Sequence, residues 1–177
     1  MSSGSSLRVC FHGAESTGKS QLAKKLADEF GVPLVAEYGR TYAETIDTNF
    51  RIADLTAIAA KQNRLMREAC AGDPKLVMLD TDPLMTAAWA EMLFGYAPNV
   101  LMGYDKAELY LLFEADVPFV EDGTRFFGSE ADRARFAALA EDMLVRAGVG
   151  FVRIAGRWEK REEKARAAIQ AALAGRR

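Results

Sequence analysis

The chain is poor in the residues that build metal clusters and disulfide frameworks. Its 177 residues include two cysteines and one histidine, and Cys10 and Cys70 have no partner at metal-ligand spacing. Free thiols are typical of proteins in a reducing compartment, so we expect a cytoplasmic location. No apolar run approaches the roughly 18 residues of a membrane span, and residues 1–6 lack the apolar core of a signal peptide. The sequence therefore predicts no membrane partner.

An excess of charge of either sign is also missing. The formal net charge is −2 at pH 7, and basic residues gather only near the C-terminus, where they alternate with glutamates as on a solvated helix face. Proteins that bind DNA or RNA usually carry a basic surface, so no nucleic-acid partner is predicted. We expect residues 7–177 to form one domain after a flexible segment at residues 1–6. A homo-oligomer is compatible with the sequence.

What the chain does contain is a complete phosphate-binding motif. Residues 13–20 read Gly-Ala-Glu-Ser-Thr-Gly-Lys-Ser, which matches G-x-x-x-x-G-K-[ST]. A β-rich run, Leu7–His12, precedes the motif, and residues 21–30 follow it with apolar residues at every fourth position, as one face of a helix requires. This strand–loop–helix setting predicts a site for a nucleoside triphosphate.

Each part of the motif has a chemical role in holding ATP and Mg²⁺. Backbone N–H groups of a glycine-rich loop close around an anion, and the N-terminus of the following helix adds a favourable partial charge. Lys19 is expected to reach the β- and γ-phosphates, and the Ser20 hydroxyl to bind Mg²⁺. The candidate ATP-binding residues of the loop are Gly13, Ala14, Glu15, Ser16, Thr17, Gly18, Lys19 and Ser20.

Short β-rich runs alternate with helical patterns along the whole chain. This alternation is typical of an α/β fold in which helices cover both faces of a parallel sheet, a three-layer arrangement. The main helical patterns cover residues 53–71, 129–148 and 159–173. The five expected strands are Leu7–His12, Pro33–Glu37, Leu76–Asp80, Leu109–Phe113 and Phe151–Ile154. In such sheets ligands bind at the carboxyl ends of the strands, so polar residues there are the candidates for function.

The second strand ends at Glu37, followed by Tyr38 and Arg40. A carboxylate at this edge of the sheet, beside the phosphate loop, is suited to accept a hydrogen bond or a proton from an alcohol. Arg40 follows one helical turn later and either binds a carboxylate or phosphate group, or pairs with Glu37 as part of the structure.

The third strand ends in two aspartates, Asp80 and Asp82. Phosphoryl transfer needs Mg²⁺ held by hard oxygen ligands, usually including an aspartate at a strand end. Either residue is suited to this, and Asp80 is the first candidate. Asp82 precedes Pro83, which is the pattern of a helix N-cap with proline at the first helical position, so a capping role is the alternative.

Three further candidates lie later in the chain. Arg125 falls in a polar loop that precedes a well-capped helix, and an arginine in a lid of this kind can stabilise charge on a transferring phosphoryl group. Arg157 and Trp158 follow the fifth strand, where they are placed to contact the nucleotide base. The alternative for Trp158 is that it anchors the last helix.

Trp89 and His12 each have a structural and a functional interpretation. Trp89 lies among apolar residues at helical spacing after the third strand, so it belongs either to the core or to a substrate site. His12 stands between the first strand and the phosphate loop, and a single histidine there is expected to be a packed residue rather than a catalyst.

Four motifs in their order resemble one family. They are Gly-Ala-Glu-Ser-Thr-Gly-Lys-Ser, Glu-Tyr-Gly-Arg, Asp-Thr-Asp and Glu-Asp-Gly-Thr-Arg. Together they are similar to the ribosylnicotinamide kinase domain of NadR-type proteins, within the P-loop kinase superfamily, over about residues 7–169. The resemblance implies a five-stranded parallel sheet in the order 2-3-1-4-5. It also implies transfer of the ATP γ-phosphate to the 5′-hydroxyl of nicotinamide riboside, which gives nicotinamide mononucleotide.

The resemblance also suggests a role for each candidate side chain. Glu37 or Asp82 would orient the ribose hydroxyls and accept the proton, while Arg40 and Arg125 would stabilise charge. The family tends to have an aromatic residue before the Glu-Tyr-Gly-Arg motif, where this chain has Ala36, so Tyr38 or Trp89 would contact the base instead. The predicted catalytic residues are Lys19, Glu37, Asp82 and Arg125; the predicted substrate-binding residues are Glu37, Tyr38, Arg40, Asp82 and Trp89; and the predicted metal ligands are Ser20 and Asp80.

Two other functions remain compatible with the motifs. One is a kinase of the same fold for another nucleoside or small alcohol, and the other is a P-loop ATPase that phosphorylates no small molecule. A guanine-specific switch is disfavoured because the chain contains no Asn-Lys-x-Asp motif.

Overall fold

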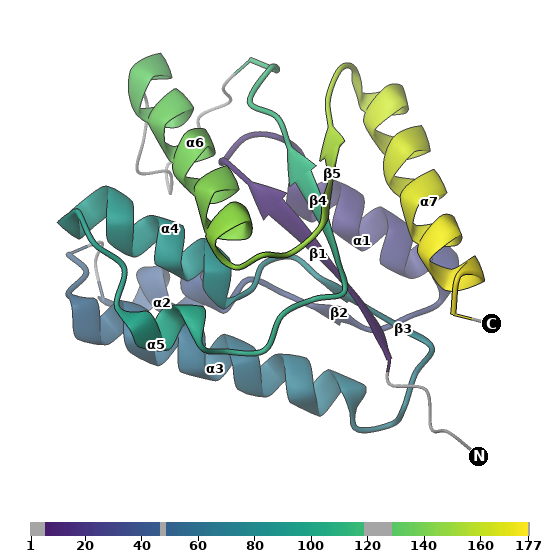
Figure 1. Ribbon diagram of the computed structural model, residues 1–177, viewed down its shortest axis with the longest axis horizontal. Helices are drawn as coiled ribbons and strands as arrows, with labels where there is room; N and C mark the ends of the chain where they lie inside the picture. Colours follow the sequence, from purple (N-terminus) through teal and green to yellow (C-terminus); the bar gives the residue numbers. More distant parts are fainter. Residues whose placement is uncertain (1–5, 47–48, 119–128, 177) are drawn as a thin grey trace.

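The fold is a parallel sheet between two layers of helices (Figure 1). The computed structural model describes residues 6–46, 49–118 and 129–176. The strands are β1 (Leu7–Gly13), β2 (Leu34–Val35), β3 (Leu76–Leu79), β4 (Leu109–Phe113) and β5 (Phe151–Ile154), in the order β2-β3-β1-β4-β5. The helices are α1 (Lys19–Phe30), α2 (Tyr38–Ile46), α3 (Ile52–Cys70), α4 (Pro83–Phe94), α5 (Asn99–Met102), α6 (Glu130–Arg146) and α7 (Trp158–Ala174). The predicted fold class and strand order are confirmed.

The central strands are buried on both faces. All four residues of β3 are buried, as are six of the seven in β1. The side chains of β1 and β4 divide between two cores. Cys10 and Tyr110 face the core under α3, α4 and α6, whereas Phe11 and Phe113 face the core under α1 and α7. Figure 1 shows these two helical layers on opposite sides of the sheet. This explains why β1 and β3 are almost continuously apolar rather than alternating.

Two elements differ from the sequence prediction. The expected strand Pro33–Glu37 contains a two-residue strand, because proline has no N–H for the ladder and the chain turns into α2 directly after residue 37. Helix α2 was not predicted. It is held by contacts with α3: the Tyr42 hydroxyl donates to Asp54 Oδ1 at 2.9 Å, and the Tyr38 N–H donates to Gln62 Oε1 at 2.9 Å.

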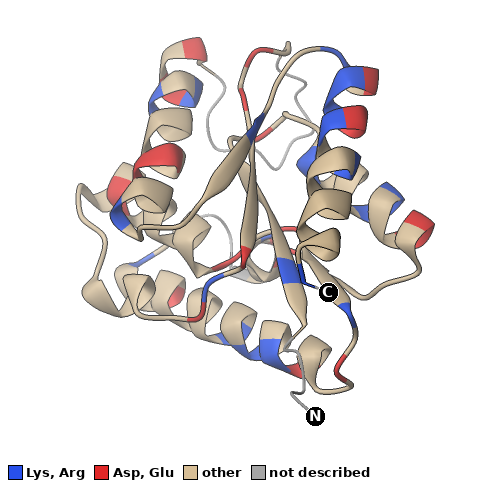
Figure 2. Cartoon of the chain, turned by 45° about the vertical axis from the view of Figure 1, so that its right-hand side comes forward, with Lys and Arg blue, Asp and Glu red and all other residues tan. Residues whose placement is uncertain are grey.

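Charge is mixed over the surface. Figure 2 shows basic and acidic residues interspersed along the outer helices. Ion pairs link neighbouring elements, as where Arg166 on α7 contacts Glu29 on α1 at 2.7 Å. No helix among the described residues is both long and apolar enough to cross a membrane.

The junction between β1 and the phosphate loop depends on a glycine. Gly13 has a φ of +129°, and a Cβ there would lie 2.5 Å from the carbonyl oxygen of Phe113 in the neighbouring strand. Since that oxygen belongs to the backbone, it cannot turn aside as a flexible side chain would. The turn from strand to loop therefore requires a residue without a side chain.

We expect Gly13→Ala to lower the free energy of unfolding by about 3 kcal/mol, because the methyl group must displace the backbone of β4 and adopt a strained φ. Urea denaturation measures the loss. Gly72→Ala is the matched control, since a Cβ there meets no atom within 4 Å. Equal unfolding midpoints for the two variants would contradict the prediction.

Candidate functional site

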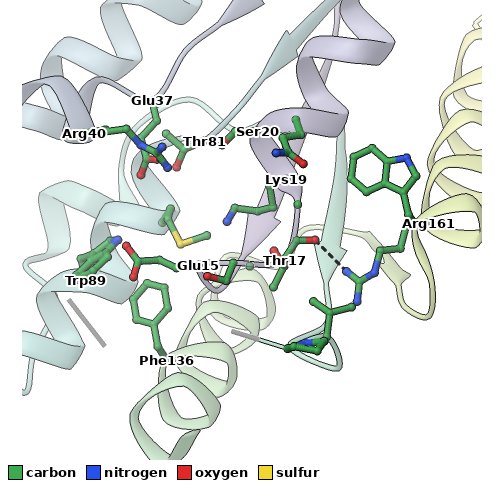
Figure 3. Close-up of a pocket in the computed structure, with 18 residues that line it drawn as sticks. Glu15, Thr17, Lys19, Ser20, Glu37, Arg40, Thr81, Trp89, Phe136 and Arg161 are labelled. Atoms are coloured by element: carbon green, nitrogen blue, oxygen red, sulfur yellow. Dashed lines mark hydrogen bonds and ion pairs between the residues drawn. The ribbon is translucent and has the colours of Figure 1, made fainter. Parts of the chain in front are cut away.

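A cavity of about 460 Å³ lies beside the phosphate loop, at the carboxyl ends of the strands (Figure 3). Its position is the one expected for a ligand site in an open α/β sheet. The predicted residues that line it are Gly13, Glu15, Ser16, Thr17, Gly18, Lys19, Ser20, Glu37, Arg40, Trp89 and Trp158. The fold therefore brings the phosphate loop, the end of β2 and the two tryptophans to one cavity.

The phosphate loop has the curved backbone of an anion-binding loop. Ser16 has a φ of +57° and Gly18, the N-cap of α1, has a φ of +85°. The Thr17 hydroxyl and the Lys19 ammonium both donate to the carbonyl oxygen of Ala14, each at 2.9 Å. Ala14 is thus buried behind the loop and shapes it without lining the cavity. Successive residues of this curvature direct backbone N–H groups toward a common point, which suits a phosphate group.

Lys19 and Glu37 form the charged centre of the cavity. The removal of water around Lys19 lowers the pKa of its ammonium, while the negative charges of Glu37 and Asp80 oppose that shift. The pKa of the Glu37 carboxyl is raised by the same loss of water, and the nearby Lys19 charge opposes the rise. A carboxylate with a raised pKa at the mouth of a phosphate site is suited to accept a proton from an alcohol.

The structure shows the ion pair with Glu37 that one interpretation of Arg40 predicts, and its binding of an anionic ligand stays a prediction. Its Nη2 atom forms an ion pair with Glu37 Oε2 at 3.6 Å, and the residue also lines the cavity. Half of the Arg40 side chain is exposed, so this pair holds Arg40 only weakly and leaves it able to contact an anionic ligand.

Asp80 has the chemistry of a Mg²⁺ ligand. Its side chain is 8% exposed, and among the residues the structure describes its Oδ1 atom has no hydrogen-bond partner. A buried carboxylate oxygen left without a donor is costly unless a cation or an ordered water satisfies it. Asp80 also interacts electrostatically with Lys19, which places it near the phosphate loop. Asp80 is not among the residues that line the cavity, whereas Ser20 is; the oxygens of both are of the type that Mg²⁺ prefers.

Asp82 does not line the cavity. It is fully buried, its Oδ1 accepts the N–H of Leu84 at 3.0 Å, and its Oδ2 accepts the hydroxyl of Tyr110 on β4. Burial raises the pKa of Asp82 to about 6. The structure thus shows the capping alternative, with Leu84 and Tyr110 holding both carboxylate oxygens inside the protein and away from the cavity.

His12 lies in the same buried region and is a packed residue, as expected. Its Nε2 lies 2.8 Å from the carbonyl oxygen of Ala140 and donates to it, while its ring meets Tyr110 edge-on. Burial lowers the pKa of His12 to about 4. The folded protein therefore holds a neutral imidazole at neutral pH.

This burial predicts an acid-dependent loss of stability. As pH falls from about 6.5 to about 4, protons bind His12 in the unfolded chain but not in the folded one, which costs the folded state about 3 kcal/mol. Asp82 has the opposite effect: because its pKa is raised in the folded protein, its protonation below about pH 6 adds to the stability of the folded state.

His12→Gln keeps a donor for Ala140 and removes the titration of residue 12. Urea denaturation between pH 7 and pH 4.5 should show a smaller loss of stability than wild type, and equal losses would contradict the assignment.

The remaining predicted residues are placed as follows. Trp89 packs on Phe136 with ring centroids 4.8 Å apart and also lines the cavity, so its contact with a substrate stays a prediction. Trp158 lies over the phosphate loop, 3.0 Å from where a Cβ on Gly18 would be. Tyr38 packs against Tyr42 outside the cavity wall. Arg157 is the exposed N-cap of α7 and does not line the cavity, and Arg125 lies outside the described residues.

Sequence reasoning missed several residues of this site. Met85 and Phe136 add apolar wall, and Thr81 follows Asp80 at the end of β3. Two arginines that contact the phosphate loop, Arg133 on α6 and Arg161 on α7, were also not among the predicted site residues. The helical periodicity of the sequence contained a signal for both residues. Each arginine lies on the buried face of its helix, where apolar residues are usual, and a charged residue there indicates a specific partner.

The fold and the cavity define a P-loop nucleotide-binding protein. A protein-family profile described as "AAA domain" matches residues 8–161, and the chain belongs to that family. The chain is 31% identical over 153 residues to the trifunctional NAD biosynthesis/regulator protein NadR of Escherichia coli K12, and equally to NadR of Salmonella typhimurium LT2. Each match covers 82% of this chain, and the chain spans 37% of the length of those relatives.

Solved structures show the same fold. A NadR protein in complex with NR superposes with a TM-score of 0.77 at 23% identity, over 97% of this chain and 53% of that one. A thymidylate kinase from Ehrlichia chaffeensis gives 0.66 at 12% identity, over 96% of this chain and 100% of that one. A deoxyadenosine kinase from M. mycoides gives 0.67 at 8% identity, over 93% and 99%. The resemblance to NadR-type proteins inferred from the motifs is thereby confirmed.

Proposed function

We propose that the chain is a kinase that uses ATP and Mg²⁺ to phosphorylate the 5′-hydroxyl of nicotinamide riboside, giving nicotinamide mononucleotide. The observation that carries the proposal is the meeting of Lys19 and Glu37 at one cavity beside the phosphate loop. The similarity to NadR, a protein named for NAD biosynthesis and solved with NR and with NAD and AMP-PNP, supports the choice of substrate.

The residues of the cavity divide the chemistry between them. The loop backbone and Lys19 bind the triphosphate, and Glu37 orients the acceptor hydroxyl and takes its proton, because a carboxylate of raised pKa is the stronger base. Arg40, and Arg125 from the sequence, stabilise charge on the phosphoryl group. Ser20 and Asp80 would hold Mg²⁺, which when bound neutralises charge on the phosphates.

Substrate recognition falls to the aromatic and apolar wall. Trp89 and Phe136 present ring surfaces to the acceptor side of the cavity, with Met85 beside them. Trp158 lies on the other side of the loop, where it contacts the ATP base. We place this activity in the cytoplasm, acting on a small molecule without nucleic-acid or membrane partners.

A panel of nucleosides tests the proposal. The protein is incubated with Mg·ATP and nicotinamide riboside, adenosine, uridine, cytidine or thymidine, and the products are identified by mass spectrometry. We expect nicotinamide mononucleotide as the main product and no product when EDTA removes the metal. ATP hydrolysis without any phosphorylated nucleoside would contradict a kinase, and preference for another nucleoside would contradict the substrate.

A further inference from the structure

Three successive carbonyl groups of the phosphate loop are held by two arginines from different helices. Arg133 on α6 donates from Nε to the carbonyl oxygen of Glu15 and from Nη2 to that of Ser16, both at 3.3 Å. Arg161 on α7 donates from Nη1 to the carbonyl oxygen of Thr17 at 3.2 Å, and Figure 3 shows this contact as a dashed line. A guanidinium group therefore lies at each loop carbonyl from residue 15 to residue 17, and Arg161 also lines the cavity.

The geometry of the peptide bond turns these contacts into a constraint on the N–H groups. In a trans peptide the C=O of one residue and the N–H of the next point in opposite directions. Among the described residues no peptide bond is cis. By holding the carbonyls of residues 15, 16 and 17, the two arginines therefore also fix the directions of the N–H groups of Ser16, Thr17 and Gly18, each of which points away from the carbonyl before it. These N–H groups are the donors that an anion-binding loop needs.

Both arginines are anchored so that they cannot easily release the loop. Arg133 is 8% exposed and also donates from Nη1 to the carbonyl oxygen of Val117 at 2.6 Å. Arg161 is 1% exposed and also donates to the carbonyl oxygens of Gly156 at 2.7 Å and Glu114 at 3.1 Å. An ion pair with Asp116 completes the surroundings of Arg161.

Burial of a guanidinium group costs more free energy than burial of an apolar side chain. The hydrogen bonds that each arginine makes must therefore offset the cost of burying it. Those contacts are directed at backbone carbonyls of the phosphate loop and of the segments after β4 and β5. Arg161 thus joins three segments that border one cavity, and Arg133 joins two.

We propose that Arg133 and Arg161 are positioning residues that fix the peptide planes of the phosphate loop, so that its N–H groups converge on the triphosphate before ATP binds. The proposal rests on the proposed function only in requiring that this loop binds a polyphosphate. It assigns to the two arginines an effect on the triphosphate and none on the nucleoside acceptor.

Charge-preserving substitutions test this role. Arg133→Lys and Arg161→Lys keep a positive charge, but one ammonium group cannot reproduce the planar, multiply donating contacts of a guanidinium. Arg146→Lys on α6 and Arg166→Lys on α7 are matched controls, because these arginines form ion pairs at the surface of the same two helices. Calorimetry measures the affinity of each folded variant for inorganic tripolyphosphate with Mg²⁺ and, separately, for nicotinamide riboside.

We expect each test variant to bind tripolyphosphate at least about tenfold more weakly than wild type, because the hydrogen bonds from the guanidinium group to the loop carbonyls are lost. Its affinity for nicotinamide riboside should be unchanged. Both controls should bind tripolyphosphate as wild type does. Unchanged tripolyphosphate affinity in Arg133→Lys or Arg161→Lys would overturn the proposal, as would an equal loss for both ligands, which a merely structural role predicts.

Two outcomes need a second measurement. If Arg161→Lys does not fold, Arg133→Lys and Arg133→Gln decide the matter, since Gln offers donors but no charge and should also lose tripolyphosphate affinity. If wild type binds tripolyphosphate but phosphorylates no nicotinamide riboside, the proposed function is wrong. The positioning role is then decided by the tripolyphosphate affinities of the arginine variants.

Discussion

Replacing Lys19 by alanine is expected to abolish phosphoryl transfer, with a fall in kcat of at least about 10²–10³-fold. The ammonium of Lys19 is held at the cavity by the carbonyl oxygen of Ala14 and lies in the field of Glu37 and Asp80. In the proposed function it neutralises charge that builds up between the β- and γ-phosphates as the bond breaks. Without it, Glu37 also loses the charge that most strongly opposes the rise of its pKa, so that pKa should rise further and a larger fraction of the carboxyl should be protonated.

The rate of nicotinamide mononucleotide formation, followed by chromatography at saturating Mg·ATP, measures this loss. Lys24→Ala is the matched control, because Lys24 lies on the same helix and pairs with Asp28 in an exposed ion pair of little energetic value. Lys24→Ala should keep the wild-type rate. A Lys19→Ala protein that retained a tenth of the wild-type rate would contradict the role given to Lys19.

The features that could be predicted from the sequence are those fixed by local physical rules. The phosphate loop, the order of the strands and the cap at Asp82 follow from glycine conformation, apolar periodicity and N-cap chemistry. The meeting of Glu37 with Lys19 also follows, because the carboxyl ends of parallel strands share one edge of the sheet.

What could not be predicted depends on contacts between residues far apart in the chain. Asp82 stands at a strand end as an active-site carboxylate would, yet Tyr110, 28 positions later, holds its side chain in the interior. Helix α2 is held against α3 by the hydrogen bonds of Tyr38 and Tyr42 with residues of that helix. Arg133 and Arg161 contact the loop across more than 100 residues of sequence. Periodicity locates such a residue on a buried stripe but does not identify its partner.

Glu37→Gln is expected to separate acceptor chemistry from ATP binding. The substitution keeps the size of the side chain and a hydrogen-bond acceptor for the ribose hydroxyl, but it removes the base, so kcat should fall by about 10²–10⁴-fold. The affinity for AMP-PNP, measured by calorimetry, should change little, because the loop backbone and Lys19 hold the triphosphate. The exposed Glu44 on α2 provides the control, and Glu44→Gln should behave as wild type.

The pH dependence of the same reaction tests directly whether Glu37 takes the proton. Because the pKa of Glu37 is raised, the fraction of ionised carboxylate, and with it kcat/KM for nicotinamide riboside, should fall as pH drops through a value above that of an ordinary glutamate. In Glu37→Gln this acidic limb should disappear, since no group remains to be protonated at that position. A Glu37→Gln enzyme that kept both the wild-type rate and the acidic limb would show that another group takes the proton. With both oxygens of Asp82 held by Leu84 and Tyr110, Asp80 would then be the carboxylate to test next.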